Sequence, residues 1–474
     1  MKKLRIWIPL ILVLAIFTGY LLYQQRFAKV GENSYDRTVE SIDLSGSPVS
    51  DLSQLRRFRE LKRIDLRNTG ISCGEYDQVR AWFPDAEILW DIPFQGEYYD
   101  MNTDRLALTT LPREEIPVLD YFTRLKIISA EKSPDYETLD YLRQQRPDLR
   151  LDYKVPLGDT RYRHNIKQLT VSGEMLEDLF TAMPYFPELT AVKLEGSLPE
   201  MDRILAFREA FPQMEVTWSF DLGGVTVEES AEQLDLTGIP MTVEQIEAAL
   251  PYMPNVTFID MTDCGISNED MDALNRRHED VKIVWTVDIG RRFRLRTDAT
   301  HFMPVKVGIY ATDEITYNLR YCTDMIAIDM GHMGVSNIDF VKYMPHLKYL
   351  LLCETHVTDL TPLTGLKELV YLELFLTPQK DLSPLLTLKA LEDLNLSYTY
   401  GDAEIIAQMT WLKNLWWCNR EGYGISWKQQ QMLREALPDC NFNFRYMSST
   451  GGGWRELPNY YAQRDVLGMY YMTG

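Results

Sequence analysis

Leucine-like positions recur along the C-terminal part of the chain at a short, nearly constant period. The first such position of each phrase falls at Met325, Leu347, Leu369, Leu391 and Leu415, in steps of 22, 22, 22 and 24 residues. Near the start, Val39 and Leu61 are again 22 residues apart. A fixed period of this kind indicates stacked supersecondary units that share one continuous core. The pattern therefore predicts a repeat array and not a set of separate globular domains.

Inside each phrase, short segments alternate apolar and polar residues, as in "IDL", "IDM" and "LNL". Alternation with a period of two predicts strands with one buried face. Other segments carry apolar residues at helical steps, as at Met271 and Leu274. Prolines end these helical segments at positions 84, 147, 212 and 438. Because strand and helix alternate throughout, the predicted fold class is α/β.

A second, longer period runs through residues 37–290. Four phrases, each a helical segment followed by a turn and a strand, align through Trp90, Tyr153, Trp218 and Trp285, in steps of 63, 65 and 67 residues. A fifth copy near the end of the chain places Phe444 in the same column. Each superrepeat is expected to contain three strands, as "EQLDLTGIP", "VTFIDMTDCGIS" and "VKIVWTV" indicate for the fourth.

The two periods divide the chain into segments. Residues 31–290 are divergent superrepeats, and residues 322–445 are the regular 22-residue repeats with the last unit. Residues 291–321 fit neither pattern and are expected to form a degenerate connecting unit. The aromatic tail, residues 446–474, is expected to cap the open end of the array, because terminal repeats must shield their core; a partner-docking segment is the alternative. Gly451–Gly453 lack the Lys-Ser/Thr of a phosphate loop.

Three consecutive phrases carry the same residues at the same positions. They are Leu347, Leu350, Leu352, Thr355, Val357 and Leu360; Leu369, Leu372, Leu374, Thr377 and Leu382; and Leu391, Leu394, Leu396 and Thr399. This phrase resembles the leucine-rich repeat of the internalin-like bacterial class. The resemblance implies a solenoid with a parallel β-sheet on its concave face and helices and turns on its convex face. Met333, Gln379 and Arg420 depart from the repeat.

The polar ninth position of each phrase has a physical reason that does not depend on the family. The chain turns out of each strand there and exposes backbone donors to the interior, where they need partners. Small polar side chains are predicted to supply these partners at Ser47, Thr69, Ser197, Thr355, Thr377 and Thr399. Cys264 is interpreted as a small substitute at this position, without redox chemistry.

In a repeat of this kind, the residues that alternate with the buried leucines point off the concave sheet. They form a mixed aromatic and acidic strip: Tyr349, Leu351, His356, Tyr371, Glu373, Phe375, Asp393, Asn395, Tyr398, Tyr400 and Trp417. Interfaces are enriched in aromatic anchors, so this strip is predicted to bind a partner. The alternative is that the C-terminal tail covers some rows, or that the aromatic residues are tolerated singly.

Charge and composition narrow the range of partners. The formal net charge is −20 and the pI is near 4.8, which repels phosphate backbones and argues against nucleic acid as a partner. The six cysteines include no CxxC pair and therefore indicate no zinc module. A disulfide between Cys418 and Cys440 is left open.

The sequence carries no recognisable catalytic motif. Its six histidines form no HExxH motif, and it contains no Gly-x-Ser-x-Gly elbow. His346, Cys353 and His356 have loosely metal-like spacing, but the repeat places His346 before the strand and away from the other two. The chain is therefore predicted not to be an enzyme and to bind no metal or cofactor.

The N-terminus carries a targeting pattern. Lys2, Lys3 and Arg5 precede 18 uncharged residues from Ile6 to Tyr23, and a membrane-spanning helix needs about 20 apolar residues, with a lower limit of about 17. Residues 1–30 are therefore predicted to be a cytoplasmic stub and one transmembrane anchor, with the repeats outside the cytoplasm. A cleaved signal peptide, which would make the protein secreted, and a buried helix are the alternatives.

Together these patterns predict a membrane-anchored, extracytoplasmic leucine-rich repeat protein that binds a macromolecule. The family resemblance implies a protein partner, with a glycan as a second possibility. The alternative is an envelope-associated assembly protein whose repeats make homotypic contacts. The oligomeric state is left open.

Overall fold

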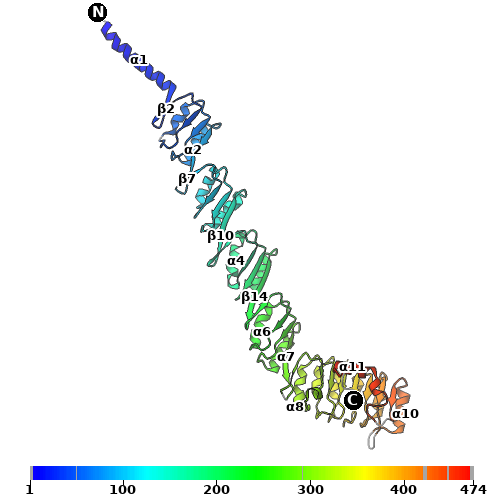
Figure 1. The fold of residues 1–474 in the computed structure, drawn as a ribbon. Helices are drawn as coiled ribbons and strands as arrows, with labels where there is room; N and C mark the ends of the chain where they lie inside the picture. Colours follow the sequence, from blue (N-terminus) through cyan, green and yellow to red (C-terminus); the bar gives the residue numbers. More distant parts are fainter. Residues whose placement is uncertain (1–3, 50, 291, 420–423, 446–447, 470–474) are drawn as a thin grey trace. The chain divides into compact units, whose positions relative to one another are not determined.

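The computed structural model describes residues 4–49, 51–290, 292–419, 424–445 and 448–469 (Figure 1). The chain divides into two compact units, Met1–Trp218 and Ser219–Gly474. Both units are built from short strands connected by helices and turns, and most strand pairs within the sheets are parallel. The predicted α/β class is thus confirmed.

The first unit contains helix α1 (Leu4–Arg26), an antiparallel strand pair and four further groups of strands, the last of which continues past Trp218. The strands are β1 (Phe27–Val30), β2 (Asn33–Asp36), β3 (Ser41–Asp43), β4 (Arg63–Asp65), β5 (Glu87–Leu89), β6 (Asp91–Phe94), β7 (Glu97–Asp100), β8 (Arg105–Ala107), β9 (Ile127–Ala130), β10 (Arg150–Leu157), β11 (Thr160–Arg163), β12 (Gln168–Ser172), β13 (Ala191–Glu195) and β14 (Glu215–Leu222). The connecting helices are α2 (Cys73–Trp82), α3 (Tyr136–Gln145), α4 (Leu176–Ala182) and α5 (Met201–Ala210).

The strand registers confirm the predicted three-strand superrepeat. In the first copy, Ile42 of β3 pairs with Ile64 of β4, which pairs with Ile88 of β5, and all three side chains are buried. Helix α2 begins at a capping box, in which the Ser72 hydroxyl accepts from the Glu75 amide and the Glu75 carboxylate accepts from the Ser72 amide. The aligned aromatic column is buried at every position: Trp90, Tyr153, Trp218, Trp285 and Phe444.

Each superrepeat ends in an antiparallel ribbon that the hydrophobic pattern did not predict. The ribbons pair β6 with β7, β10 with β11, β14 with β15 (Val225–Glu228), and β19 (Thr286–Asp288) with β20 (Arg294–Arg296). Gln95 and Gly96, between β6 and β7, both have positive φ values, 52° and 79°. Positive φ at both central residues is what a type I′ hairpin turn requires.

Helix α1 contains the whole uncharged N-terminal run, while Lys2 and Lys3 lie outside the described residues. In the part of the chain that the structure describes, no helix combines the length and the apolar character that a membrane crossing needs. The membrane anchor therefore stays a prediction from the sequence.

The second unit contains a three-stranded sheet and a seven-stranded parallel sheet. The smaller sheet is β16 (Gln233–Asp235), β17 (Phe258–Asp260) and β18 (Lys282–Val284). The larger is β21 (His301–Phe302), β22 (Ala327–Asp329), β23 (Tyr349–Leu351), β24 (Tyr371–Glu373), β25 (Asp393–Asn395), β26 (Asn414–Trp416) and β27 (Asn441–Asn443). The helices are α6 (Val243–Ala249), α7 (Asn268–Arg277), α8 (Asp313–Thr316), α9 (Ala403–Ile406), α10 (Trp427–Ala436) and α11 (Pro458–Val466).

The seven-stranded sheet follows the 22-residue period. Leu350 pairs with Leu372, and Leu372 pairs with Leu394, all in parallel register and all buried in one inner core. The second unit is therefore a leucine-rich repeat solenoid. The sequence period aligned Leu415 with Leu391, a step of 24 residues. In the structure Leu415 pairs with Leu394, a step of 21 residues. This error of three residues in the last regular turn affects one predicted site residue, as shown below.

Threonines at the ninth position are buried, but their role is the reverse of the one predicted. The hydroxyls of Thr355 and Thr399 donate hydrogen bonds of 2.6 Å to the carbonyls of Leu352 and Leu396. They satisfy backbone acceptors, because backbone N–H groups of these turns already have partners: those of Glu354 and Leu376 donate to the next repeat, and that of Thr399 donates to Leu396 in its own repeat. Thr69 and Thr377 bond in the same way, and the Cys264 thiol donates to the Leu236 carbonyl. Ser47 and Ser197 are exposed and do not take this role.

The stretch 291–321 contributes to two different sheets. Strand β20 completes the ribbon with β19, and β21 opens the seven-stranded sheet by pairing with β22. The stretch thus connects the ribbon after β18 to the seven-stranded sheet; the hydrophobic pattern did not reveal β20 and β21, which are three and two residues long.

Candidate binding face and its C-terminal segment

Side chains on the seven-stranded sheet alternate between the inner core and a second face, which we call the outer face. The outer face carries Ala327, Asp329, Tyr349, Leu351, Tyr371, Glu373, Asp393, Asn395 and Trp416. Residues 448–469, which we call the C-terminal segment, lie against this face (Figure 1, where α11 is red and the sheet is yellow to orange). The segment is therefore not the end cap that its composition suggested, and the alternative that the tail covers rows of the sheet is confirmed.

Trp454 is the central contact of the C-terminal segment. Its ring centroid lies 5.2 Å from that of Tyr371 and 5.4 Å from that of Trp416, and its side chain is fully buried. The indole N–H donates a hydrogen bond of 2.7 Å to Oε1 of Glu373. The Tyr371 hydroxyl donates to the same carboxylate oxygen. Leu457 and Tyr460 pack against the same apolar cluster.

Further hydrogen bonds hold the segment along its length. Asn395 Nδ2 donates to the Ser449 carbonyl at 2.7 Å, and Trp416 Nε1 donates to the Gly451 carbonyl at 2.8 Å. Asn459 Nδ2 donates to Oδ2 of Asp393 at 3.1 Å. At the far end, Lys306 Nζ bonds to the carbonyls of Leu467 and Gly468 at 3.1 and 2.9 Å. The contacts thus run across the sheet from β26 back toward β21.

The outer face is acidic beneath the segment. Burial raises the pKa of the Glu373 carboxyl, and it also raises the pKa values of Asp393 and Asp329. Among the described residues, none of these three carboxyls forms an ion pair with Lys, Arg or His; Arg455 is the cation whose charge bears on Glu373. A buried carboxylate without a paired cation is unfavourable. Burial also raises the pKa of the Tyr371 hydroxyl, which keeps it a hydrogen-bond donor.

The structure brings most of the predicted site residues together. Six of them, Tyr349, Leu351, Tyr371, Glu373, Asp393 and Asn395, lie on the outer face in β23, β24 and β25. Phe375 and Tyr398 lie in the turns after the strands and are also buried. His356 and Tyr400 lie farther along these turns and are exposed. Apart from these two residues and half-buried Tyr349, the predicted strip is not open to solvent, because the C-terminal segment and the neighbouring turns cover it.

Trp417 was assigned to the wrong face. Its side chain lies in the inner core, and its indole N–H donates to the Thr399 carbonyl. The cause is the register of the last regular turn: Trp416, not Trp417, is the partner of Asn395 in the parallel pairing. Trp416 and Trp454 are the two functional candidates that the sequence interpretation missed. Aligning Leu415 with Leu394 instead of Leu391 would have placed Trp416, and not Trp417, beside Asn395.

The cysteines do not form the disulfide that was left open. Cys418 lies in the outer-face cluster and Cys440 in the inner core, so their thiols are on opposite sides of the sheet and no disulfide joins them. Cys353 is buried, and burial raises the pKa of its thiol. Across the described ranges, no three His, Cys, Asp or Glu side chains are grouped so as to hold a metal ion.

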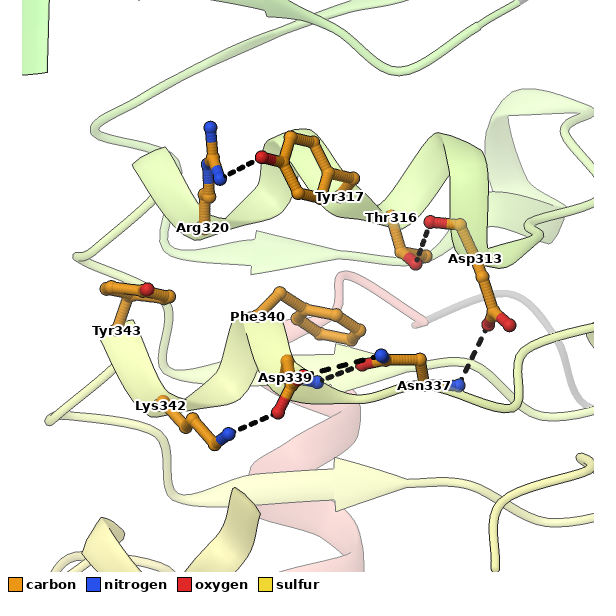
Figure 2. A pocket seen from close by; sticks show the side chains of 9 residues that line it. All are labelled: Asp313, Thr316, Tyr317, Arg320, Asn337, Asp339, Phe340, Lys342 and Tyr343. Atoms are coloured by element: carbon orange, nitrogen blue, oxygen red, sulfur yellow. Dashed lines mark hydrogen bonds and ion pairs between the residues drawn. The ribbon is translucent and has the colours of Figure 1, made fainter. Parts of the chain in front are cut away.

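A separate hollow of about 290 Å³ lies between the 3₁₀ turns Tyr317–Tyr321 and Asp339–Tyr343 (Figure 2). Its lining residues are Asp313, Thr316, Tyr317, Arg320, Asn337, Asp339, Phe340, Lys342 and Tyr343. The charged groups pair with one another or with the backbone: Asp313 accepts from the Asn337 amide at 2.9 Å, Lys342 donates to Asp339, and Arg320 lies over the Tyr317 ring. We therefore interpret the hollow as a seam between two repeats.

No protein-family model matches the chain, and no curated protein matches it. Similar solved structures include an internalin from Listeria monocytogenes, with 10% identity, 88% of this chain and 91% of that chain covered, and a TM-score of 0.27. A second internalin of that organism shares 14% identity over 49% of this chain and 83% of its own, with a TM-score of 0.23. A leucine-rich repeat protein from Leptospira interrogans shares 15% identity over 86% and 96%, with a TM-score of 0.25. The leucine-rich repeat architecture rests on the register of this chain itself.

Proposed function

We propose that the protein is a binding protein that recognises a segment of another protein on the outer face of its seven-stranded sheet. The observation that supports this proposal is the C-terminal segment. The outer face accommodates a peptide of 22 residues, including a fully buried tryptophan and a helix, by contacts that leave the sheet pairing intact. A face that accepts one aromatic peptide has the shape and the donors and acceptors to accept another.

The chemistry of the face defines the partner. Glu373 and Asp393 offer carboxylate oxygens to N–H donors, and the rings of Tyr371 and Trp416 form the walls of a site for one large aromatic side chain. A partner segment with an indole and an amide donor at the spacing of Trp454 and Asn459 meets these groups. The acidic balance of the whole chain favours cationic partners in addition.

The test is capture of a protein from an extract by the immobilised full-length chain, followed by repetition with a variant of the face. Tyr349→Ala is the informative variant, because Tyr349 is half-buried, packs against both apolar clusters of the outer face and is not part of the inner core. Trp427→Ala, on exposed α10, is the control. Capture that falls with Tyr349→Ala alone supports the outer face. Equal capture by all three chains argues for another surface, and self-association without any captured protein favours homotypic assembly.

We further propose that the repeats lie outside the cytoplasm, anchored by the N-terminal segment. The support is the sequence alone: three cationic residues before an uncharged run of 18. Protease added to intact cells should then remove most of the chain. Full protection of the region around Trp454 would contradict this location.

A further inference from the structure

We infer that the C-terminal segment is a resident, displaceable ligand of the outer face, and that the protein exposes this face to a partner only when the segment leaves. The inference deepens the proposed function and rests on it. It assigns residues 448–469 a regulatory role: they compete, within one chain, with the segment of the partner.

The first support is the separation of the two cores. The inner core runs without interruption from Leu222 to Phe444 and contains no residue of the C-terminal segment. Trp454 and Leu467 belong instead to two small clusters on the outer face. The segment also adds no strand to the sheet, since its described residues form helix α11 and turns. Release of the segment therefore leaves the inner core and every strand pair of the solenoid in place.

The second support is that the docked segment buries polar groups at a cost. Glu373 is 3% exposed and, among the described side chains, has no ion-pair partner, although it accepts from Trp454 and Tyr371. Gln463 of α11 is 1% exposed, and its Oε1 accepts no hydrogen bond. Burying such groups opposes docking. The free energy of docking is therefore less favourable than the apolar contacts of Trp454 and Leu467 alone would make it.

The third support is the chemistry of the site beneath Trp454. A permanent cap needs only apolar packing, as the inner core shows at Leu350 and Leu372. The outer face instead hydrogen-bonds individual donors and acceptors of the segment. Glu373 accepts from the Trp454 indole, Asp393 accepts from Asn459, and Asn395 donates to the Ser449 carbonyl. Specific hydrogen-bonding groups of this kind discriminate between peptides.

The experiment uses the full-length chain and a fluorescein-labelled synthetic peptide of residues 448–469. An attached segment competes at an effective concentration of about millimolar, so the wild-type chain should bind the labelled peptide weakly. In the Trp454→Ala chain the resident segment is weakened, and the peptide should bind at least about a hundredfold more tightly than to the wild-type chain. The same peptide with Trp454→Ala is the matched control and should not bind.

Absence of peptide binding to a Trp454→Ala chain that melts like the wild type would overturn the inference, because the segment would then be a fixed part of the fold. Should Trp454→Ala fail to fold, Asn459→Ala with Lys306→Ala weakens two edge contacts and leaves the buried rings in place. Light scattering should show a monomer for the wild-type chain; a dimer that exchanges its segments would also overturn it.

The outcome distinguishes this inference from the proposed function. Peptide binding does not depend on the identity of a partner, so it tests the resident segment directly. If the peptide binds and the opened chain captures more protein from an extract than the wild type, both proposals are supported. If the peptide binds and capture does not increase, the inference about the segment is supported and the proposed function of the face is contradicted.

Discussion

The indole N–H of Trp454 and the carboxylate of Glu373 form a hydrogen bond of 2.7 Å between residues 81 positions apart. This bond joins the C-terminal segment to the middle strand of the seven-stranded sheet, β24. Tyr371 contacts both partners, by its hydroxyl at Glu373 and by its ring at Trp454. The three side chains therefore act as one unit, and a change in any of them is expected to alter how firmly the segment docks.

Trp454→Ala should release the segment without unfolding the solenoid. Truncation of a buried Trp costs about 3–5 kcal/mol, and here the cost falls on the contact between segment and sheet. Hydrogen exchange, followed by mass spectrometry, should become faster over residues 448–469 and stay unchanged over Leu347–Leu396. Trp427→Ala, whose side chain is 71% exposed, is the matched control and should leave both regions unchanged. Faster exchange throughout residues 325–415 would show that the segment is part of the main core.

The outer-face carboxyls predict an unusual dependence on pH. Burial raises the pKa of Glu373 above its ordinary value of 4.5, so the docked state binds more protons than the open state between the two values. The Glu373 carboxyl therefore favours docking fully at pH values below its ordinary pKa. This contribution is lost as pH rises through the pKa that Glu373 has in the docked state. Asp393 and Asp329 act in the same direction, since burial raises the pKa of each, whereas the charge of Arg455 opposes the effect at Glu373. The segment should therefore dock more firmly at pH 5 than at pH 8.

Glu373→Gln isolates this effect. The amide oxygen keeps an acceptor for Trp454 and Tyr371, and the side chain cannot ionise, so docking at pH 8 should be stronger than in the wild type. Hydrogen exchange over residues 448–469, measured at pH 5 and pH 8 and corrected for the intrinsic exchange rates, should show that the variant loses most of the pH dependence of docking. Glu435→Gln, on the exposed side of α10, is the control and should behave like the wild type. A variant that keeps the full dependence would show that another group titrates.

Local periodicity was enough to predict the solenoid and most of its outer face. Alternation placed Tyr371 and Glu373 on one side of a strand and Leu372 on the other, which is what the sheet shows. It failed at Trp417, because the turn before β26 is one residue shorter than the others, and a repeat counted from the wrong leucine moves every side chain to the wrong position.

The docking of the segment could not be predicted in the same way. Trp454 contacts Tyr371 and Glu373 through tertiary packing between residues more than 80 positions apart, and no period connects them. The pattern also missed β7 and β11, since the edge strands of the antiparallel ribbons are polar and mostly exposed. Their hairpin turns, such as Gln95-Gly96, are signals that a search for turn residues would have found.

Thr355→Val should destabilise the solenoid although the two side chains have nearly the same shape. The hydroxyl of Thr355 donates to the buried carbonyl of Leu352 at 2.6 Å, and Val leaves this carbonyl without that bond. An unsatisfied buried acceptor costs about 1–3 kcal/mol. Urea unfolding should show this loss for Thr355→Val and little of it for Thr355→Ser, which keeps the hydroxyl. A loss for Thr355→Ser as large as that for Thr355→Val would show that the hydroxyl bond to Leu352 does not account for the effect.

Gln379→Leu should stabilise the protein. Gln379 is fully buried at a position where the repeat calls for an apolar residue, and neither its Oε1 nor its Nε2 has a hydrogen-bond partner. Burying an amide without compensation costs about 1–3 kcal/mol on the scale of protein mutations, so a leucine of similar volume should recover most of that amount. Gln408→Leu, at an exposed site on the neighbouring turn, should change stability by less than about 0.5 kcal/mol. Thermal melts of the two variants decide the point: a melting temperature that falls with Gln379→Leu would mean that the amide is satisfied in solution, by water or by a partner group.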